Sequence, residues 1–374
     1  MSSSISEGET IGDVHVHRYM DGDENRIVPF LERHMGWPSV ASSVPHLDHW
    51  RWKFLGNPLG FHLVCVAERN GEIISHSASL PARIKIGQET VIASQGVDLV
   101  TDPAFRGHGL IGQTMKCRNR IKDDHSVALD FGFPNHAAYQ LSLMKQGFQD
   151  LNITMLQHRF IVDTELFFSK VRFGSIKRLG YGSMEAVRRS LSRSIDLGEG
   201  VMVEEATKIG ADFDSLYERA SRDFDMMLVR DSGHLAWRYG DPRAGRFIIR
   251  TIRCDGQLAG YMVYKEEERD GTRFLNIVDY LVDPDLPHLH SGLINDSISL
   301  AKGLRVETIL CCLPKGHPYS KSLSEAGFRS EVRYTGERPM SVIALERGGG
   351  HALMETLKRK DLRAHIMLGD TDWV

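Results

Sequence analysis

The sequence predicts an α/β (α+β) fold in two tandem copies, each a mixed, mostly antiparallel sheet flanked by helices. Hairpin signals alternate with strand–turn–helix signals along the chain, and four short landmarks recur in order at a nearly constant offset. The length of 374 residues is enough for two domains with hydrophobic cores of their own.

The pattern of the first half predicts a strand and a helix, followed by antiparallel strands. Residues 14–19 alternate between apolar and polar side chains, and residues 24–34 repeat with a helical period. The apolar runs 63–67 and 73–80 flank Asn70-Gly71, a dipeptide typical of type I′ turns. We therefore expect a strand, a helix and a β-hairpin, in that order.

A second hairpin through Gly87 leads into an apolar strand at residues 97–101, which ends before a basic, glycine-rich turn. In this turn Gly107 and Gly109 allow the backbone to approach a ligand closely, and the helix that follows leaves its first N–H groups unpaired. With Arg106 beside the positive end of the helix dipole, the turn predicts a site for a phosphate or pyrophosphate. It lacks the Gly-Lys-Ser/Thr of a P-loop, and it fits Gly-x-Gly-x-x-Gly only loosely.

Four landmarks of the first half recur in the second half. The pairs are Trp50-Arg51-Trp52 with Trp237-Arg238-Tyr239, Asn70-Gly71 with Asp255-Gly256, Val100-Thr101-Asp102-Pro103 with Val282-Asp283-Pro284, and Gly147-Phe148 with Gly327-Phe328. Their offsets drift from 187 to 180 residues, which indicates an internal duplication with small loop differences.

The copies differ at the glycine turn, because no Arg-Gly-x-Gly follows Pro284. We therefore expect a ligand-binding first domain at residues 13–162, a connector at 163–200 and a degenerate second copy at 201–374. The stretch from His351 predicts a further helix, and the Trp373 that follows a polar turn predicts a last strand on the second sheet.

Composition excludes several function classes. A net charge of −3 argues against nucleic acid or an anionic membrane as a partner. No apolar run reaches membrane-spanning length, and the N-terminus shows no apolar leader. Five cysteines, odd in number and without a Cys-x-x-Cys pair, favour a reducing cytoplasm. Paired histidines occur without acidic or cysteine partners, so we expect no metal.

The run Val-x-x-Pro-x-Phe-Arg-Gly-x-Gly, followed by Phe133-Pro134-Asn135 and a helix ending in Gly147-Phe148, resembles the GCN5-related N-acetyltransferase (GNAT) superfamily. Arg106 and Gly109 match the family's turn, whereas Ile111 holds its last position and Gly112 comes one residue late. The resemblance covers nearly the whole chain, as in tandem bacterial members with a degenerate second copy.

The resemblance implies acetyl-CoA, or another acyl-CoA, as the co-substrate. It places the pyrophosphate on the turn, the oxyanion on backbone N–H groups of the preceding strand, and the pantetheine near Asn135, which is alternatively a simple helix N-cap. The implied cofactor-binding residues are Leu99, Val100, Thr101, Arg106, Gly107, His108, Gly109, Leu110, Ile111, Gly112 and Asn135. For His108 we expect a backbone contact.

Acyl transfer to an amine also needs a proton acceptor, since a free alkylamine titrates near ~10. Asp98 on the central strand is the first candidate, with a structural ion pair as the alternative, and Asp130 is the second. The family's general-acid Tyr falls at Leu143 or Ser142, so Tyr139, one turn before Leu143, is the candidate acid. Water is the alternative.

These observations favour an acetyl- or acyl-CoA-dependent N-acyltransferase of the GNAT type. Its acceptor is an amine of a small molecule, with an amino sugar or a cell-envelope precursor as candidate classes. The alternative is a non-catalytic acyl-CoA-binding sensor or scaffold. We expect a cytoplasmic protein, and the sequence gives no indication of an oligomeric state.

Overall fold

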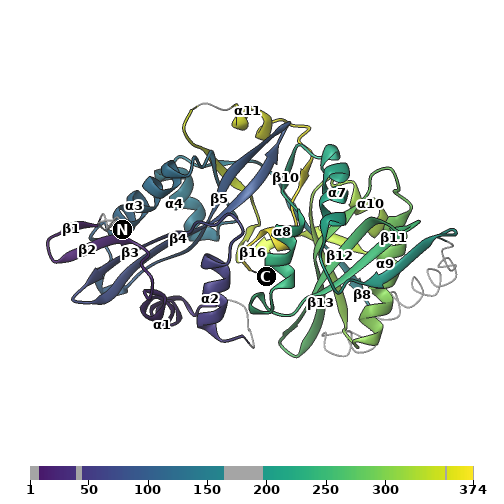
Figure 1. The fold of residues 1–374 in the computed structure, drawn as a ribbon, viewed down its shortest axis with the longest axis horizontal. Coiled ribbons are helices and arrows are strands. Elements are labelled where there is room, and N and C mark those ends of the chain that lie inside the picture. Colours follow the sequence, from purple (N-terminus) through teal and green to yellow (C-terminus); the bar gives the residue numbers. More distant parts are fainter. Residues whose placement is uncertain (1–7, 39–43, 164–196, 350–351, 374) are drawn as a thin grey trace.

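The computed structural model describes residues 8–38, 44–163, 197–349 and 352–373, and it has two halves that lie side by side (Figure 1). Residues 164–196, which make up most of the predicted connector, lie outside the described residues. The C-terminus lies between the two halves, close to α2 and α8 in this view (Figure 1).

The first half is built on a mixed, mostly antiparallel sheet with the order β1-β2-β3-β4-β5-β6-β18-β7, in which only β5 and β6 run parallel as neighbours. The strands are β1 (Glu9–Ile11), β2 (Val14–Arg18), β3 (Leu63–Arg69), β4 (Glu72–Ile86), β5 (Glu89–Thr101), β6 (Leu129–Gly132), β7 (Gln149–Asp150) and β18 (Ile343–Glu346). Asn70 and Gly71 have φ values of 53° and 81°, as the predicted type I′ turn requires.

Helices cover both faces of this sheet. They are α1 (Glu24–Met35), α2 (His46–Leu55), α3 (Leu110–Asp124) and α4 (His136–Lys145). Along β3, Val64 and Val66 belong to the apolar cluster of α1 and α2, whereas Leu63 and Cys65 belong to the cluster of α3. The period-2 alternation of a strand therefore sends consecutive side chains to different cores.

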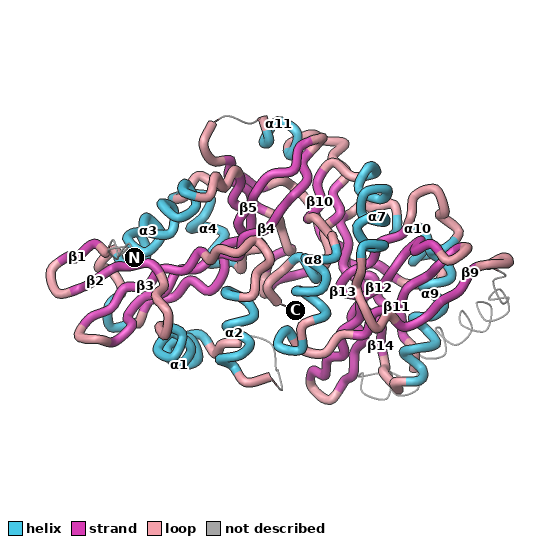
Figure 2. Tube along the Cα trace, viewed as in Figure 1, coloured by secondary structure: helices cyan, strands magenta, loops and turns pink. Residues whose placement is uncertain are grey.

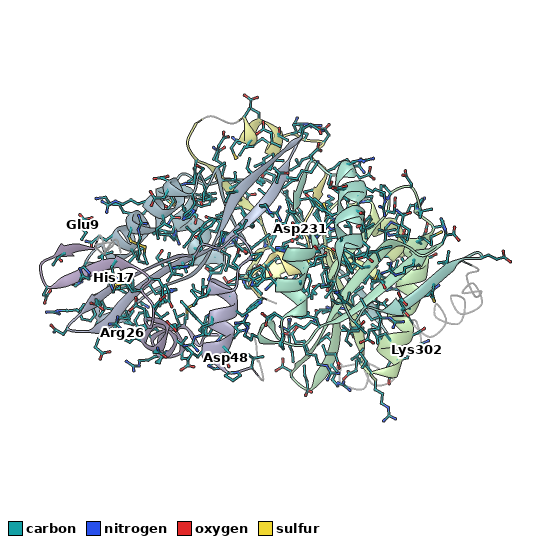
Figure 3. All side chains as sticks on the ribbon, viewed as in Figure 1. Glu9, His17, Arg26, Asp48, Asp231 and Lys302 are labelled. Carbon is teal, nitrogen blue, oxygen red and sulfur yellow. A yellow bond between two sulfur atoms is a disulfide. The ribbon has the colours of Figure 1, made fainter. Side chains whose placement is uncertain are left out.

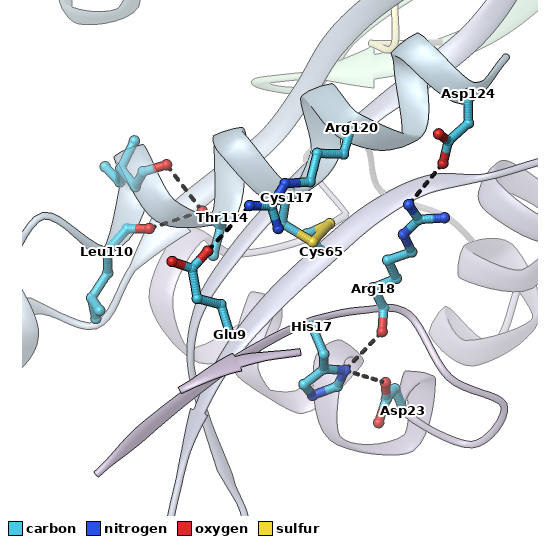
Figure 4. Close-up of a disulfide and its surroundings, with 11 residues drawn as sticks. Glu9, His17, Arg18, Asp23, Cys65, Leu110, Thr114, Cys117, Arg120 and Asp124 are labelled. Carbon is cyan, nitrogen blue, oxygen red and sulfur yellow. Dashed lines mark hydrogen bonds and ion pairs between the residues drawn. A yellow bond between two sulfur atoms is a disulfide. The ribbon is translucent and has the colours of Figure 1, made fainter. Parts of the chain in front are cut away.

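One contact between α3 and the sheet is covalent. Cys65 on β3 and Cys117 on α3 form a disulfide across 52 residues of sequence (Figure 4). The sequence analysis did not predict this pair, because neither cysteine has a partner at a recognisable spacing. Cys254, Cys311 and Cys312 are free thiols.

The second half is built on a sheet with the order β15-β8-β14-β13-β12-β11-β9. Its strands are β8 (Met155–Ile161), β9 (Val201–Glu205), β11 (Ile248–Cys254), β12 (Gln257–Arg269), β13 (Thr272–Val282), β14 (Thr308–Pro314) and β15 (Arg329–Val332). The helices are α7 (Ala211–Ala220), α8 (Ser232–Leu235), α9 (Leu289–Gly303), α10 (Tyr319–Glu325) and α11 (Leu353–Leu357), and α7 and α9 flank the sheet (Figure 2). The predicted α/β (α+β) class is confirmed.

Strands cross between the two sheets in both directions. β8, from the first half of the sequence, lies between β14 and β15 of the second sheet. β18, from the second half of the sequence, lies between β6 and β7 of the first sheet. The sheets therefore cross the predicted domain boundary, which stays a prediction.

Further contacts join the halves where the β4–β5 hairpin extends beyond the first sheet. β10 (Met226–Leu228) pairs with β4 and with β19 (Ala364–His365), while β16 (Tyr334–Thr335) and β17 (Arg338–Pro339) form a separate ribbon. Arg83 on β4 pairs with Asp231, which caps α8 at the junction (Figure 3). A hydrophobic cluster there combines side chains of both halves. None of the described helices is long and apolar enough to cross a membrane.

Candidate active site

A glycine turn connects β5 to α3. A short 3₁₀ helix at Pro103–Phe105 follows the strand, and the Asp102 side chain caps it. Gly107 and Gly109 then adopt φ values of 84° and 76° before α3 begins. Side chains are strained at such φ values, so both positions favour glycine even though the space around them is open.

The turn is exposed and carries an unpaired positive charge. Residues 106–109 are exposed, and the first turn of α3 contains no acidic residue. Within the residues that the structure describes, the Arg106 side chain makes no hydrogen bond or ion pair. A free guanidinium beside the unpaired N–H groups of a helix N-terminus is a suitable donor set for a pyrophosphate. The residues therefore fit the phosphate end of CoA.

The remaining residues of the turn differ in exposure. The His108 ring is exposed, with Nδ1 3.1 Å from the Arg106 carbonyl oxygen. Leu110 is buried in the core under α3, Ile111 is half-buried, and Gly112 is exposed. These positions stay predictions as cofactor contacts.

Beside the turn, β5 and β6 diverge. Their parallel pairing joins Ala93–Gln95 to Leu129–Phe131. Among the described strands, β5 then continues to Thr101 along β4 alone. Gly96 and Leu99 are exposed on this stretch. We call this divergence of the two strands the β5–β6 fork; the resemblance described above predicts the pantetheine arm between these strands.

A β-bulge shapes the strand at the fork. His76 pairs with Val100 and Ala78 with Val97, so Asp98 and Leu99 face a single residue of β4. Leu99 is 36% exposed. A bulge leaves backbone groups outside the regular ladder, which suits the predicted oxyanion role of residues 99–101.

The Asp98 carboxylate is buried and fully engaged. Its Oδ2 accepts hydrogen bonds from Lys53 Nζ at 2.8 Å and from Trp37 Nε1 at 3.1 Å, and its side chain is 5% exposed. Asp98 has a φ of 46° and accepts a 2.6 Å bond from His76 Nδ1 at its carbonyl oxygen. The structural ion pair that the sequence analysis considered is therefore present, and the role of Asp98 as base stays a prediction.

Asp130 lies in a second buried ion cluster. It accepts hydrogen bonds from Ser94 Oγ, from Lys122 Nζ at 2.8 Å and from Arg347 Nη1 at 3.3 Å. Burial raises the pKa of this carboxyl, but the two cations and the hydrogen bonds outweigh burial and lower it. Asp130 thus ties α3, β5 and β6 to an arginine of the second half of the sequence.

Two further candidate site residues, Tyr139 on α4 and Asn135 at its N-cap, also have hydrogen-bond partners within the protein. Tyr139 donates a 2.8 Å hydrogen bond to Asp150, and the Arg338 guanidinium lies 3.2 Å from its ring centroid. Burial, followed by the contact with Asp150, raises the Tyr139 pKa. Asn135 is the N-cap of α4 and accepts a bond from the Ala138 N–H, as the alternative interpretation expected. Neither contact tests the predicted roles.

Sequence reasoning missed a carboxylate at the C-terminal end. Asp372 Oδ2 lies 3.6 Å from Lys53 Nζ, so one ammonium faces Asp98 and Asp372 together. Trp373 packs edge-on against Phe133, the residue directly after β6. The tail therefore reaches the first half, and the expectation of a last strand on the second sheet is wrong. No local signal marks such an aspartate in a polar turn.

Two tryptophans join the halves near this site. Trp52 Nε1 donates to the Trp237 carbonyl oxygen at 2.7 Å, Trp237 Nε1 donates to the Trp52 carbonyl oxygen at 3.0 Å, and the rings stack. The two residues are 185 positions apart, as are the turns Asn70-Gly71 and Asp255-Gly256. Trp237 therefore contacts Trp52, not the Trp50 with which the landmark comparison paired it, and the internal duplication stays a prediction.

The second half has no comparable turn. His288 precedes α9 with a φ of −66°, and Asp283 pairs with Arg219. A cavity of about 380 Å³ opens there between α9 and α10, with Tyr319 in its wall. The described residues contain no group of three side chains that could hold a metal ion.

Comparisons with known proteins relate the chain to acyltransferases. Residues 16–142 match the family model of an acetyltransferase (GNAT) domain. No curated protein matches the chain.

Solved structures share the fold across both halves. They include a probable N-acyltransferase of Enterococcus faecalis V583 (10% identity, TM-score 0.60, 88% of this chain and 72% of that one). GCN5-related N-acetyltransferases of Anabaena variabilis (12%, 0.60, 88% and 72%) and Kribbella flavida (13%, 0.57, 89% and 70%) are also similar. At these identities the likeness shows the fold alone. The match to the family model identifies residues 16–142 as an acetyltransferase (GNAT) domain.

Proposed function

We propose that the chain transfers an acetyl or other acyl group from a CoA thioester to an amine of a small molecule in the cytoplasm. An amino sugar or a cell-envelope precursor is the proposed acceptor class. The observation that carries the proposal is the position of the exposed Arg106 turn directly beside the β5–β6 fork. The two features offer an anion site and a slot for an extended arm, as a CoA thioester requires.

Each binding role in this proposal is assigned to residues of the turn, the strand edge or the helix N-cap. Arg106 and the N–H groups of residues 107–112 hold the pyrophosphate, and the edge of β5 from Leu99 to Thr101 donates N–H groups to the thioester oxygen. Asn135 caps α4 on the other side of the fork and contacts the pantetheine. Preorganised backbone donors are usually the largest electrostatic contribution to acyl transfer.

The first test measures both binding and turnover. Arg106→Ala should weaken acetyl-CoA binding about ten- to a hundredfold, since losing a charged contact to phosphate costs about 1.5–3 kcal/mol. Gly109→Val should weaken binding further, because a β-branched residue at a φ of 76° is strained and blocks the approach of the backbone. Titration calorimetry gives the affinities, and thiol release with a panel of amines gives the rates.

The matched control is Arg120→Ala, an exposed arginine on α3 that lies away from the turn and pairs with Glu9 (Figure 4). It should leave affinity unchanged. Equal affinities for the parent, Arg106→Ala and Gly109→Val would exclude the turn as the CoA site. A parent that binds acetyl-CoA yet releases no thiol with any amine would instead favour the acyl-CoA sensor.

A further inference from the structure

The C-terminal segment carries a carboxylate into the site of the first half. Asp372 Oδ2 lies 3.6 Å from Lys53 Nζ, and Lys53 donates a 2.8 Å hydrogen bond to Asp98 on the bulge of β5. The next residue, Trp373, contacts Phe133 after β6. The segment therefore lies beside Lys53, the residue that holds Asp98 of β5, and against Phe133, which directly follows β6.

The two carboxylates differ in their availability to a substrate. The Asp98 side chain is 5% exposed and already accepts bonds from Lys53 and Trp37. The Asp372 side chain is 18% exposed, and its one described ion-pair contact is the 3.6 Å approach to Lys53. Asp372 is therefore the carboxylate that a bound acceptor can reach.

The charges around Asp372 favour proton uptake. Burial raises the pKa of the Asp372 carboxyl, and the nearby Asp98 carboxylate raises it further. Lys53 and Arg238 lower it, but the net result is a raised pKa. The imidazoles of His76 and His49, which interact electrostatically with Lys53, are neutral at pH 7, because burial lowers the pKa of each to about 4. Two carboxylates that share one ammonium form a pair in which one member readily takes a proton.

We propose that Asp372, supplied by the second half of the chain, accepts the proton of the acceptor's ammonium group, while Lys53 and Asp98 position it. This inference rests on the proposed N-acyltransferase function. It also gives the second half a part in the chemistry of the first.

The reaction then balances. The ammonium gives one proton to the Asp372 carboxylate, and Asp372 returns this proton to solvent after turnover. The free amine forms a C–N bond with the thioester carbon, the C–S bond breaks, and the sulfur leaves with its electron pair. The nitrogen loses its second proton as the amide forms, and the thiolate takes it up. The products are an amide, a CoA thiol and one proton.

The test compares Asp372→Asn with the parent on two small acceptors that differ in protonation at pH 7. With 2-aminoethanol, which is an ammonium, Asp372→Asn should lower kcat about 10²–10⁴-fold, the usual contribution of a positioned base. The loss should shrink as pH rises toward the pKa of the amine. With methoxyamine, which is already unprotonated, kcat should change less than about threefold. Acetyl-CoA affinity should stay unchanged by calorimetry.

The control is Asp361→Asn, a fully exposed aspartate of the same C-terminal region, which should match the parent on both acceptors. Equal losses on both acceptors would assign Asp372 a structural role and overturn the proposal. Full activity of Asp372→Asn with 2-aminoethanol would also overturn it and leave Asp98 as the base. If the parent binds acetyl-CoA but acylates no amine, the proposed function and this inference fail together.

Discussion

The protonation of a single buried residue, His76, affects the stability of the first half. Its ring is fully buried, Nδ1 donates to the carbonyl oxygen of Asp98, and Nε2 has no hydrogen-bond partner among the residues that the structure describes. Burial lowers its pKa from 6.5 to about 4, although the Asp98 contacts oppose this shift. The site therefore keeps a neutral donor under the bulge that shapes the fork.

The pH dependence follows from that pKa. A group whose pKa is lower in the folded state binds more protons when unfolded, so its contribution to stability is full above about pH 6.5. It is lost as pH falls toward about 4. We predict that the free energy of unfolding in urea decreases over this window and decreases less steeply in His76→Asn, which keeps a donor near Nδ1 but does not titrate.

Part of the slope will remain in His76→Asn, because burial also lowers the pKa of other histidines. These are His49, His234 and His290, to about 4, and His317, to about 3. Urea curves at pH 7 and pH 5 for both proteins check the prediction. Identical slopes would mean that His76 contributes nothing to the acid sensitivity.

At the scale of elements, the exchange of β8 and β18 makes each sheet depend on the other half. β18 fills the position between β6 and β7, and β8 fills the corresponding position between β14 and β15. The spatial order of the strands is also the same in the two sheets. The first sheet has the order β2-β3-β4-β5-β6-β18-β7, and the second has the corresponding order β9-β11-β12-β13-β14-β8-β15. This correspondence supports the proposal of an internal duplication.

We predict that a chain truncated after Gly200 is insoluble and inactive. Without β18, β6 and β7 each expose a strand edge whose N–H and C=O groups are hydrogen-bonded in the full chain. Co-producing residues 1–200 with residues 201–374 should restore a soluble complex, because each piece carries a strand of the other's sheet. Size-exclusion chromatography and thiol release measure the two outcomes. A soluble, fully active piece ending at Gly200 would contradict the prediction.

Local elements could be predicted from the sequence, whereas long-range pairings could not. The Asn70-Gly71 turn and the Gly107–Gly109 turn follow from residue types that tolerate positive φ, and both occur as expected. The place of β18 depends on an edge nearly 200 residues earlier, and a four-residue strand carries no signal of that partner. Asp372 was missed for the same reason, because its ion-pair partner, Lys53, comes from α2, more than 300 residues earlier.

At the scale of the whole molecule, the two sheets share a strand arrangement, but the residues that precede α3 and α9 differ. The first half presents an exposed Arg106 turn with two glycines at positive φ. In the second half, His288 stands before α9 in a right-handed conformation, and Asp283 and Asp285 place carboxyl groups near that helix. Carboxylates oppose the binding of a phosphate.

We therefore predict one acetyl-CoA site per chain. Titration calorimetry should give a stoichiometry near one for the parent, and Arg106→Ala should weaken that single transition. A variant altered in the cavity of the second half, Lys321→Ala, should bind like the parent. Two equivalent transitions, or loss of binding in Lys321→Ala, would show that the second half holds CoA as well.

The strand exchange also determines when the first sheet can be completed during synthesis of the chain. When β7 has left the ribosome, the strand that belongs between it and β6 has not yet been made, because β18 begins at Ile343. At about 5–20 residues per second, the roughly 200 intervening residues take about 10–40 s to synthesise. During that interval the nascent first half exposes two unsatisfied strand edges and lacks the tail at the fork. The enzyme should therefore depend on holding chaperones while it is translated, and it should become competent for turnover only after β18 and Asp372 have been synthesised.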